Sequence, residues 1–600
     1  MQKPTSAPQT APYAAAKKCL DLKQYREAEQ HIHAILRKNI NDGAGLALLA
    51  DLNVAQNKIE KAMAFYIAAI CADPAALAHK EKFIEYCGYL SIDKCEEING
   101  RAILECLKSG DVLDCSELRV VWLQHLLLEP AFQAAFGLTQ WKNFDTENNG
   151  RLFGGIADFS PALTPYFLLG LKNLVIHNPV FEEFITRLRL ATLADFGTFK
   201  KFTADEMTTL AAALAHYSFA TDYILDTADE EQKAVDMLQT ALEGLDTAYL
   251  ASSAAAVALM AAYVPLHRLA NAADVAGPFA AHPDLGSVIR THITDHVKLA
   301  EMAAGVQSTT AITNAVSARV QEQYEEFPYP RWKAASVQRI RAQWDGNPKN
   351  APVTKRLKDT AAKILIAGCG TGQQALMYAS VFPDAEILAV DLSRSSLAYA
   401  IERARAYQIN NVTFRQADIL HLDTLGQSFD LVVCVGVLHH MQDPAAGWQV
   451  LSRCLKPDGL MRIGLYSKIA RAAVMQTAAL AKREGYGDDA SGMKRFRRNS
   501  PALLDRSTLD DLAAFADYYT LNEYRDLLFH AQERNYTLPE IDELLEKTGL
   551  SFIDFTVPMA APPDQQPGES TLDAWHRFEQ QNPRTFRGMY IFWCRKKDAA

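Results

Sequence analysis

A short apolar run leads directly into a glycine-rich segment, and this arrangement restricts the fold more than any other feature of the chain. Lys363–Ala367 ends at Gly368-Cys369-Gly370-Thr371-Gly372, and a helical pattern begins at Gln373. Glycines allow a tight turn in which backbone N–H groups come close to a ligand. The pattern predicts a buried parallel strand, a nucleotide-type loop and a helix, which is how a doubly wound α/β domain begins.

Further strands follow this opening. Glu386–Val390 reads as the second and ends in Asp391, 23 residues after Gly368, where a carboxylate can accept hydrogen bonds from both hydroxyls of a ribose. Apolar runs predict five more strands, and a helix from Pro539 to Thr548, followed by Gly549, lies among them. The five further strands are expected at residues 411–415, 428–434, 460–466 (after the turn 456–459), 551–557 and 589–595.

The order of these motifs resembles that of class I S-adenosylmethionine-dependent methyltransferases. GCGTG, the acidic end of the second strand, Ala417-Asp418 after the third, FDLVVCVGVLHH and LKPDG follow at that family's spacing. The resemblance implies a Rossmann-like seven-stranded domain, with the last strand antiparallel. It also implies S-adenosylmethionine as the cofactor and S-adenosylhomocysteine as the product. The implied cofactor-binding residues are Gly368, Cys369, Gly370, Thr371 and Gly372 under the methionine part, Asp391 and Leu392 at the ribose, Asp418 and Ile419 at the adenine, and Gly436 in the floor of the methyl-transfer pocket.

One position departs from the family pattern. Many members carry an acid where Ile366 stands, and that acid helps to hold the cofactor's amino group. Another group must replace it, or the affinity is reduced. The candidates are Gln373, Gln374, Tyr324 and Arg331.

His439 and His440 stand where a methyltransferase can place a general base. Methyl transfer needs alignment and an unprotonated nucleophile, and sometimes a base that removes the proton. Packing or a structural hydrogen bond is the alternative role for either histidine, as it is for Tyr324 and Tyr466. Cys369 suits the turn by its size and has no base beside it in the sequence. Nothing in the sequence indicates a metal.

Residues 467–537 form an insertion after the fifth strand, where such segments surround the ligand crevice, so we expect it to select the substrate. Its run Lys494–Arg498 carries four basic side chains. These either clamp an acidic or phosphorylated substrate or form a solvated, internally paired surface.

The N-terminal part shows self-similarity. Residues 24–28 align with residues 58–62 at an offset of 34, which is the period of a tetratricopeptide repeat, and Tyr66, Ala69 and Pro74 fall at that repeat's spacing. Residues 77–320 continue in an all-α pattern with loops at 148–150 and 154–155. This half is either a docking surface for a peptide or protein partner or a structural wrapper.

Two stretches of the chain call for their own interpretation. Thr247–Leu266 has no charged residue and is about long enough to span a bilayer, but its many Ala and Ser residues predict a buried helix. Tyr324–Trp332 contains two prolines among aromatic residues, which predicts an extended connector. That connector acts either as a lid over the cofactor or as an apolar linker.

The expected layout has five parts: a flexible tail at 1–11, tetratricopeptide-like helices at 12–76, a helical middle region at 77–320, the connector at 321–358 and the methyltransferase domain at 359–597. The fragments YEEFPYPRW, AGCGTGQ, IGLYS, YRDLLFH and TFRGMY are similar to a bacterial family that joins tetratricopeptide repeats to this domain.

Composition limits the remaining functions. A net charge of -10 gives no general attraction to nucleic acid, and ten scattered cysteines without a CxxC pair favour a reducing cytoplasm. The first residues lack the apolar run of a signal peptide. The sequence predicts methyl transfer to an N or O nucleophile of a protein or small-molecule acceptor. The alternative is a non-catalytic scaffold that retains the fold, and a dehydrogenase is disfavoured because the loop is not GxGxxG.

Overall fold

The computed structural model describes residues 11–94, 96–136, 158–326, 332, 340–341, 344, 346–358, 361–556 and 566–597. The chain divides into two compact units. Unit 1 comprises residues 1–293 and 333–336, and unit 2 comprises residues 294–332 and 337–600. The loops expected at 148–150 and 154–155, and most of the connector, lie outside the described residues.

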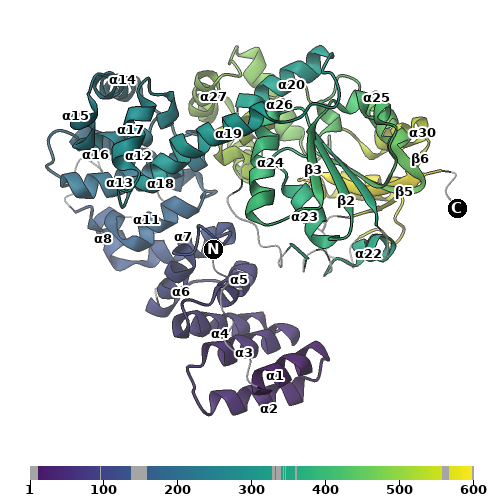
Figure 1. Ribbon diagram of the computed structural model, residues 1–600, viewed down its shortest axis with the longest axis horizontal. Helices are drawn as coiled ribbons and strands as arrows, with labels where there is room; N and C mark the ends of the chain where they lie inside the picture. Colours follow the sequence, from purple (N-terminus) through teal and green to yellow (C-terminus); the bar gives the residue numbers. More distant parts are fainter. Residues whose placement is uncertain are drawn as a thin grey trace. The chain divides into compact units, whose positions relative to one another are not determined.

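Unit 1 is helical in its described part (Figure 1). Consecutive helices pack as pairs at its start, where α1 contacts α2 and α3 contacts α4. The helices are α1 (Ala11–Asp21), α2 (Tyr25–Leu36), α3 (Gly43–Ala55), α4 (Ile59–Ala72), α5 (Leu77–Tyr86), α6 (Glu97–Leu107), α7 (Arg119–Leu128), α8 (Pro130–Phe136), α11 (Pro165–Asn173), α12 (Pro179–Asp195), α13 (Ala204–Ala220), α14 (Asp229–Glu243), α15 (Thr247–Ala251), α16 (Ala254–Ala261), α17 (Ala272–Phe279) and α18 (Leu285–Ile289).

The repeated sequence segments lie at equivalent places in α2 and α4. Ala28 and Ala62 are both fully buried, and so are Ile32 and Tyr66. The small side chains of Ala28 and Ala62 let the paired helices approach closely. The two repeated segments therefore occupy helices with the same pattern of buried residues.

The uncharged stretch at 247–266 folds as two short helices, α15 and α16, rather than as one. Seven consecutive residues of α16, Ala255 to Ala261, are buried, so the predicted burial is confirmed although the single helix is not. In the described part of the chain, no helix combines the length and hydropathy that crossing a bilayer requires.

Unit 2 is built on a seven-stranded sheet with the order β3-β2-β1-β4-β5-β7-β6, in which β7 runs antiparallel to both neighbours. The strands are β1 (Lys363–Ala367), β2 (Glu386–Asp391), β3 (Val412–Gln416), β4 (Phe429–Val435), β5 (Leu455–Leu465), β6 (Leu550–Phe555) and β7 (Tyr590–Lys596). The predicted strands and the antiparallel last strand are confirmed. The predicted turn at 456–459 lies within β5 at a shift of register, because Leu455 pairs with Phe429 whereas Leu460 pairs with Leu431.

Helices cover the sheet (Figure 1). Helices α23 and α24 contact β2 and β3, whereas α25 contacts β4 and β5 and α30 contacts β6. The described helices of unit 2 are α19 (Asp295–Ala304), α20 (Ala315–Glu326), α22 (Ala351–Lys358), α23 (Gln373–Val381), α24 (Arg394–Ala406), α25 (Pro444–Cys454), α26 (Ala472–Arg483), α27 (Ala490–Leu503), α28 (Arg506–Ala513), α29 (Leu521–Leu528), α30 (Leu538–Lys547) and α31 (Leu572–Gln581).

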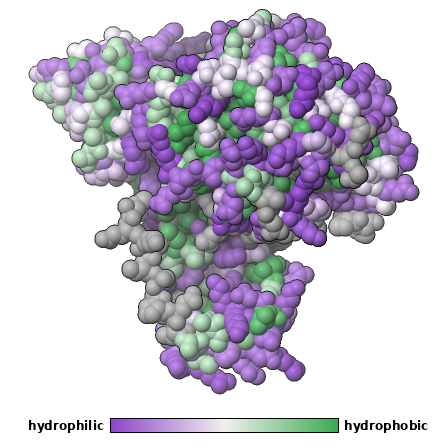
Figure 2. Space-filling view, turned by 45° about the vertical axis from the view of Figure 1, so that its right-hand side comes forward, coloured by the Kyte–Doolittle hydropathy of each residue, from purple (hydrophilic) through white to green (hydrophobic). Residues whose placement is uncertain are grey.

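Alternate residues of the central strands form the apolar core on one side of the sheet. Leu365 and Ala367 of β1 and Val432 and Cys434 of β4 join one buried cluster with Trp448 of α25. This alternation follows from the two-residue period of a strand. On the face shown in Figure 2, hydrophilic residues predominate and hydrophobic ones are interspersed among them.

Two expectations about the segment before the sheet need correction. The sequence predicts an extended Tyr324–Glu326, but these residues form the end of α20. Residues 307–310 lie beside β3: Thr309 N–H donates to the Gln416 carbonyl at 2.8 Å, and Gln416 N–H donates to the Gln307 carbonyl at 2.9 Å. Unit 2 therefore begins near residue 294, well before residue 359.

Candidate functional site

The glycine loop joins β1 to α23 at the carboxyl edge of the parallel strands. Gly368, Gly370 and Gly372 all have positive φ angles, of 74°, 50° and 84°. A Cβ at Gly368 would lie 2.3 Å from Val437, and one at Gly372 would lie 2.5 Å from Ala400. The turn therefore requires glycine for its conformation and for its packing. Cys369 between them is buried, and burial holds the pKa of its thiol well above the usual value, so it is not a nucleophile at neutral pH.

Asp391 at the end of β2 ties the glycine loop to the start of α24. Its carboxylate accepts from Gly370 N–H at 2.7 Å and from Ser393 N–H at 3.0 Å. Burial raises the pKa of this carboxyl, whereas the two backbone hydrogen bonds lower it. Leu392 follows directly, so both predicted ribose-site residues lie beside the loop.

Asp418 lies next to Asp391, because Ala417 N–H donates to the Asp391 carbonyl at 3.0 Å. Its Oδ1 accepts from Leu420 N–H at 3.0 Å, and its own N–H donates to Thr310 Oγ1 at 2.7 Å. Its Oδ2 is buried and has no hydrogen-bond partner among the described residues. A buried acceptor without a partner is costly, so this oxygen fits a donor supplied by a ligand, such as the amino group of an adenine. Ile419, also buried, begins the turn that follows.

The end of α20 and Trp332 close around the same edge of the sheet. Trp332 Nε1–H donates to the Thr371 carbonyl at 3.3 Å, and its ring stacks on Tyr407 at 6.1 Å. Tyr324 accepts from Ser393 Oγ–H through its carbonyl at 3.0 Å. The sequence left a lid and an apolar linker as alternatives for this segment, and these contacts come from its described residues. Arg331 lies outside the described residues.

Glu325 is a site residue that the sequence did not reveal. Its carboxylate accepts from Arg394 N–H at 2.7 Å, from Ser395 N–H at 3.0 Å and from Ser395 Oγ–H at 2.6 Å. It therefore caps α24 from a helix that lies 69 residues earlier in the chain, and a carboxylate at a helix N-terminus is favourable.

Replacing Glu325 with alanine is expected to destabilise unit 2 by about 1–3 kcal/mol, because three donors lose their acceptor at the start of α24. The measurement is thermal unfolding together with hydrogen exchange of the α24 amides. Glu325→Gln keeps an acceptor and should recover part of the loss. Glu322→Ala changes an exposed acid of the same helix and is the matched control. Equal unfolding of the two alanine variants would contradict the capping role.

The position of Ile366 offers no polar group to the site. Its side chain is buried in β1, between Ala389 and Val433 of the neighbouring strands. Gln373 is exposed and Gln374 is partly buried in the first turn of α23. The Tyr324 hydroxyl donates to Asp526 Oδ1 at 2.8 Å. The residue that replaces the missing acid stays open among these candidates.

His439 and His440 lie in a short 3₁₀ turn (Leu438–His440) after β4 and Gly436, and both side chains are buried. His440 Nδ1–H donates to the Gln532 carbonyl at 3.0 Å, because a carbonyl can only accept. That bond leaves the lone pair of Nε2 free. Burial holds the pKa of both imidazoles well below the usual value, so both are neutral at neutral pH.

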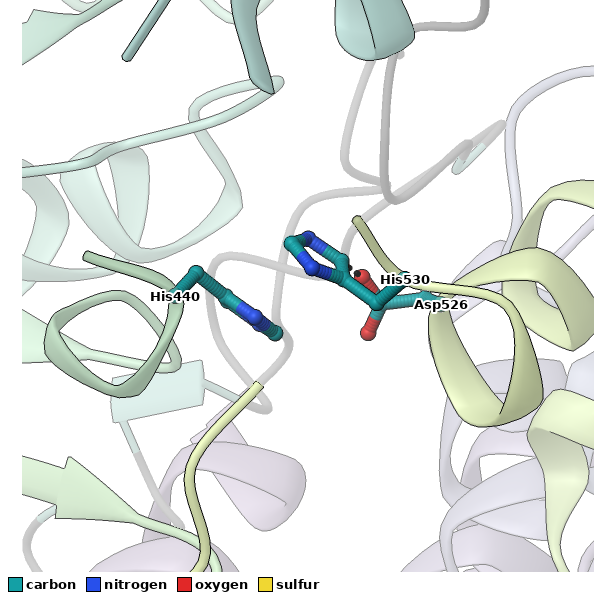
Figure 3. Close-up of side chains that lie close together, drawn as sticks. All are labelled: His440, Asp526 and His530. Carbon is teal, nitrogen blue, oxygen red and sulfur yellow. Dashed lines mark ion pairs between the residues drawn. The ribbon is translucent and has the colours of Figure 1, made fainter. Parts of the chain in front are cut away.

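Two further residues of the insertion face His440 (Figure 3). The ring of His530 stacks on that of His440 with centroids 3.7 Å apart, and His530 Nε2 lies 3.8 Å from Asp526 Oδ1. His440, Asp526 and His530 can each offer one ligand atom within 4.8 Å of the others, which is compatible with a metal ion. The sequence did not indicate this group, because His440 lies 86 and 90 residues before the other two members.

One residue of the basic run Lys494–Arg498, Arg497, contacts other residues of the insertion. The Arg497 guanidinium lies 3.9 Å from the centroid of the Tyr518 ring and donates to the Tyr518 carbonyl. Phe496 beside it is fully buried. These contacts favour internal pairing over a phosphate clamp at this position.

The fold and this site define a class of protein that comparison with known families supports. Residues 358–500 match the family model described as methyltransferase domain. Unit 2 therefore carries a methyltransferase domain, and the cofactor of this class is S-adenosylmethionine.

Individual proteins are also similar to parts of this chain. An uncharacterized protein of Synechococcus sp. is 33% identical over 233 residues, which cover 36% of this chain and 55% of that protein. A malonyl-[acyl-carrier protein] O-methyltransferase of Paenibacillus sp. is 34% identical over 186 residues, which cover 31% of this chain and 63% of that protein. The solved structure of PKMT2 from Rickettsia typhi is 18% identical, covers 42% of this chain and 52% of that one, and has a TM-score of 0.34. The chain thus spans about half the length of the first relative.

Proposed function

We propose that unit 2 binds S-adenosylmethionine at the glycine loop and catalyses transfer of its methyl group to an N or O nucleophile of an acceptor. The observation that carries this proposal is the buried Oδ2 of Asp418, which has no hydrogen-bond partner among the described residues. Asp418 directly follows Ala417, whose N–H donates to the Asp391 carbonyl. Two carboxylates thus lie side by side at the edge of the sheet, one suited to a ribose and one to an adenine amino group. The named methyltransferases among the relatives favour an enzyme over a scaffold.

Each predicted cofactor residue has a place in this proposal. Gly368, Cys369, Gly370, Thr371 and Gly372 form the loop under the methionine part. Asp391 with Leu392 and Asp418 with Ile419 hold the nucleoside, and Gly436 leaves room at the end of β4, where an added Cβ would lie 3.7 Å from Met589. When bound, the cofactor supplies an electrophilic methyl carbon.

The residues of the chain do the remaining work. The 3₁₀ turn after β4 and the insertion at 467–537 enclose the acceptor and exclude water, which strengthens electrostatic interactions there. His440 Nε2 is the atom that accepts the acceptor's proton, because its other nitrogen is held by the Gln532 carbonyl. His439 lies beside it, with ring centroids 4.2 Å apart.

We propose the helical unit as a docking surface of the tetratricopeptide kind, with repeat helices at 12–76 and a helical middle region that ends near residue 293, where unit 2 begins. The buried Ala28 and Ala62 at equivalent helix positions support it. A protein or peptide acceptor and a small molecule both fit this arrangement. No disulfide joins the cysteines of the described part, which suits a reducing compartment such as the cytoplasm.

The test combines binding with transfer. Calorimetric titration of the full chain with S-adenosylmethionine and S-adenosylhomocysteine is expected to show dissociation constants on the order of micromolar, a typical range for an enzyme ligand. Incubation with methyl-labelled cofactor and fractionated bacterial extract is expected to give a labelled product. Absence of cofactor binding by a folded chain would overturn the proposal. Binding without transfer to any fraction would favour the scaffold instead.

A further inference from the structure

A continuous series of buried polar side chains lies at the carboxyl ends of β4 and β5. It begins at the stacked rings of His440 and His530 and continues through His439 to Tyr466. The ring centroids of His439 and Tyr466 are 4.3 Å apart. The Arg471 guanidinium lies 3.7 Å from the Tyr466 ring, and its Nη2 lies 3.7 Å from Glu533 Oε2. We call this set, together with Asp517 and Asp526, the polar cluster.

Several polar atoms of the cluster have no hydrogen-bond partner. His439 is fully buried, and neither of its ring nitrogens is hydrogen-bonded to any described residue. The same holds for Arg471 Nη2 and Glu533 Oε2, although these two approach each other as an ion pair. Buried polar atoms are nearly always hydrogen-bonded, so atoms left unpaired at a candidate active site indicate a polar ligand.

The charges of the cluster indicate which kind of ligand this is. Asp517, Asp526 and Glu533 contribute three carboxyl groups, whereas Arg471 is the one cation that acts on both Asp517 and Glu533. The histidines add no positive charge, because burial keeps them neutral. An anionic acceptor would add to an existing excess of negative charge, whereas a cationic one would balance it.

We propose that the polar cluster receives a protonated amino group, which makes the methyl acceptor an amine. This inference rests on the proposed methyl transfer and narrows its N or O nucleophile to nitrogen. Asp526 and Glu533 hold the charged group, and the unpaired nitrogens of His439 complete its hydrogen bonds.

The tautomers of the two stacked histidines favour an amine over a metal ion. Gln532 N–H donates to His530 Nδ1 at 3.1 Å, so the proton of that neutral ring is on Nε2, the atom nearest Asp526. A protonated nitrogen cannot ligate a metal. The His440 and His530 rings are also stacked, with an interplanar angle of 24°, whereas metal ligation needs in-plane lone pairs that converge on one point.

The same two bonds give the histidines different roles in the reaction. The carbonyl of Gln532 fixes His440 with Nε2 free as a base. The N–H of Gln532 fixes His530 with its proton on Nε2, which donates to the Tyr324 hydroxyl at 3.4 Å, and that hydroxyl donates to Asp526 Oδ1 at 2.8 Å. His440 Nε2 takes one proton from the ammonium group. The nitrogen lone pair then forms the N–C bond as the C–S bond breaks, and the electron pair of that bond stays on sulfur. The product leaves as a methylated ammonium, and His440 returns its proton to water.

Amine binding is expected to depend on pH in a defined direction. Burial raises the pKa of Asp517 to about 6 and that of Glu533 to about 7, with Asp526 adding to both effects and Arg471 opposing them. The Asn535 amide also lowers the pKa of Glu533. Because a bound cation favours the ionised carboxylates, binding releases protons and becomes tighter as the pH rises from 6 to 8.

The experiment uses three probes of matched size on the full chain with saturating S-adenosylhomocysteine: benzylamine, benzyl alcohol and benzoate. Binding is followed by NMR of ¹³Cε1-labelled histidines, with assignments from single substitutions. Benzylamine is expected to shift the His439 and His440 signals and to bind several-fold more tightly at pH 8 than at pH 6. Asp526→Asn and Glu533→Gln should each weaken it about tenfold. Asp510→Asn, an exposed acid of the insertion, is the control and should leave the affinity unchanged.

The outcomes separate this inference from the proposed function. Tighter binding of benzoate or benzyl alcohol than of benzylamine, or no response to any probe, would overturn the amine assignment while cofactor binding stands. If Zn²⁺ alone shifted the same signals and blocked benzylamine, the cluster would be a metal site and the inference would be wrong. If the chain did not bind S-adenosylhomocysteine, that result would count against the proposed function. Benzylamine is then titrated in the absence of S-adenosylhomocysteine.

Discussion

Asp391→Ala is expected to weaken binding of S-adenosylmethionine by about a hundredfold or more. A carboxylate that holds two ribose hydroxyls contributes about 1.5–3 kcal/mol per hydrogen bond, and each 1.4 kcal/mol is a factor of ten in affinity. The substitution also removes the acceptor for Gly370 N–H and Ser393 N–H, so the glycine loop loses its connection to α24. Calorimetric titration of the full chain measures the effect.

Two variants make this result specific. Asp384→Ala changes an exposed acid in the turn before β2 and should leave the affinity unchanged. Asp391→Asn keeps the shape and one acceptor oxygen, so it is expected to retain part of the binding. Thermal unfolding of all three establishes that the chain is folded. An Asp391→Ala chain that is folded and binds the cofactor like the unmodified one would place the nucleoside elsewhere.

The sheet of unit 2 was predictable because its determinants are local. The strands are five to eleven residues long and most contain an apolar run, and the glycines of the first turn lie within five residues of sequence. Asp391 and Asp418 could be placed because both follow directly on a strand, and the carboxyl ends of parallel strands meet at one edge. The start of β5 departed from expectation, because its pairing with β4 already begins at Leu455, before the predicted turn.

The acceptor side could not be predicted in the same way, because its contacts join residues far apart in the chain. The Tyr324 hydroxyl donates to Asp526, 202 residues later, and Glu325 caps a helix that begins at Arg394. Tyr324 belongs to YEEFPYPRW, and Asp526 and His530 belong to YRDLLFH. Both fragments were noted for their resemblance to one family, and the structure shows that they meet.

A second pair of those fragments also meets in the structure. Leu465 of IGLYS pairs with Tyr590 of TFRGMY between β5 and β7, and Glu579 accepts from Ser467 Oγ–H at 2.5 Å and from Tyr590 Oη–H at 2.6 Å. Burial raises the pKa of Glu579, which these two donors partly oppose. Sequence fragments without an assigned role were therefore a useful guide to the tertiary contacts that build the acceptor side.

His440→Asn is expected to lower kcat for methyl transfer by about 10²–10⁴-fold, the usual contribution of a positioned base. Asparagine can still donate to the Gln532 carbonyl but has no second nitrogen that accepts a proton. KM for S-adenosylmethionine and the affinity for S-adenosylhomocysteine should change little, because the proposed role of His440 is on the acceptor. The measurement is the initial rate with the extract fraction that the unmodified chain labels.

The pH profile distinguishes a base from a structural histidine. Burial holds the pKa of His440 well below its usual value, so the imidazole is neutral above about pH 6.5. The rate of the unmodified enzyme therefore does not rise above that pH through titration of His440. Without this base, solvent must take the proton, and the rate of the variant is expected to rise steadily with pH. His576→Asn on α31 is the control and should behave like the unmodified chain. A His440→Asn enzyme with an unchanged rate, or with a reduced rate and an unaltered pH profile, would assign His440 to packing and leave the proton to another group.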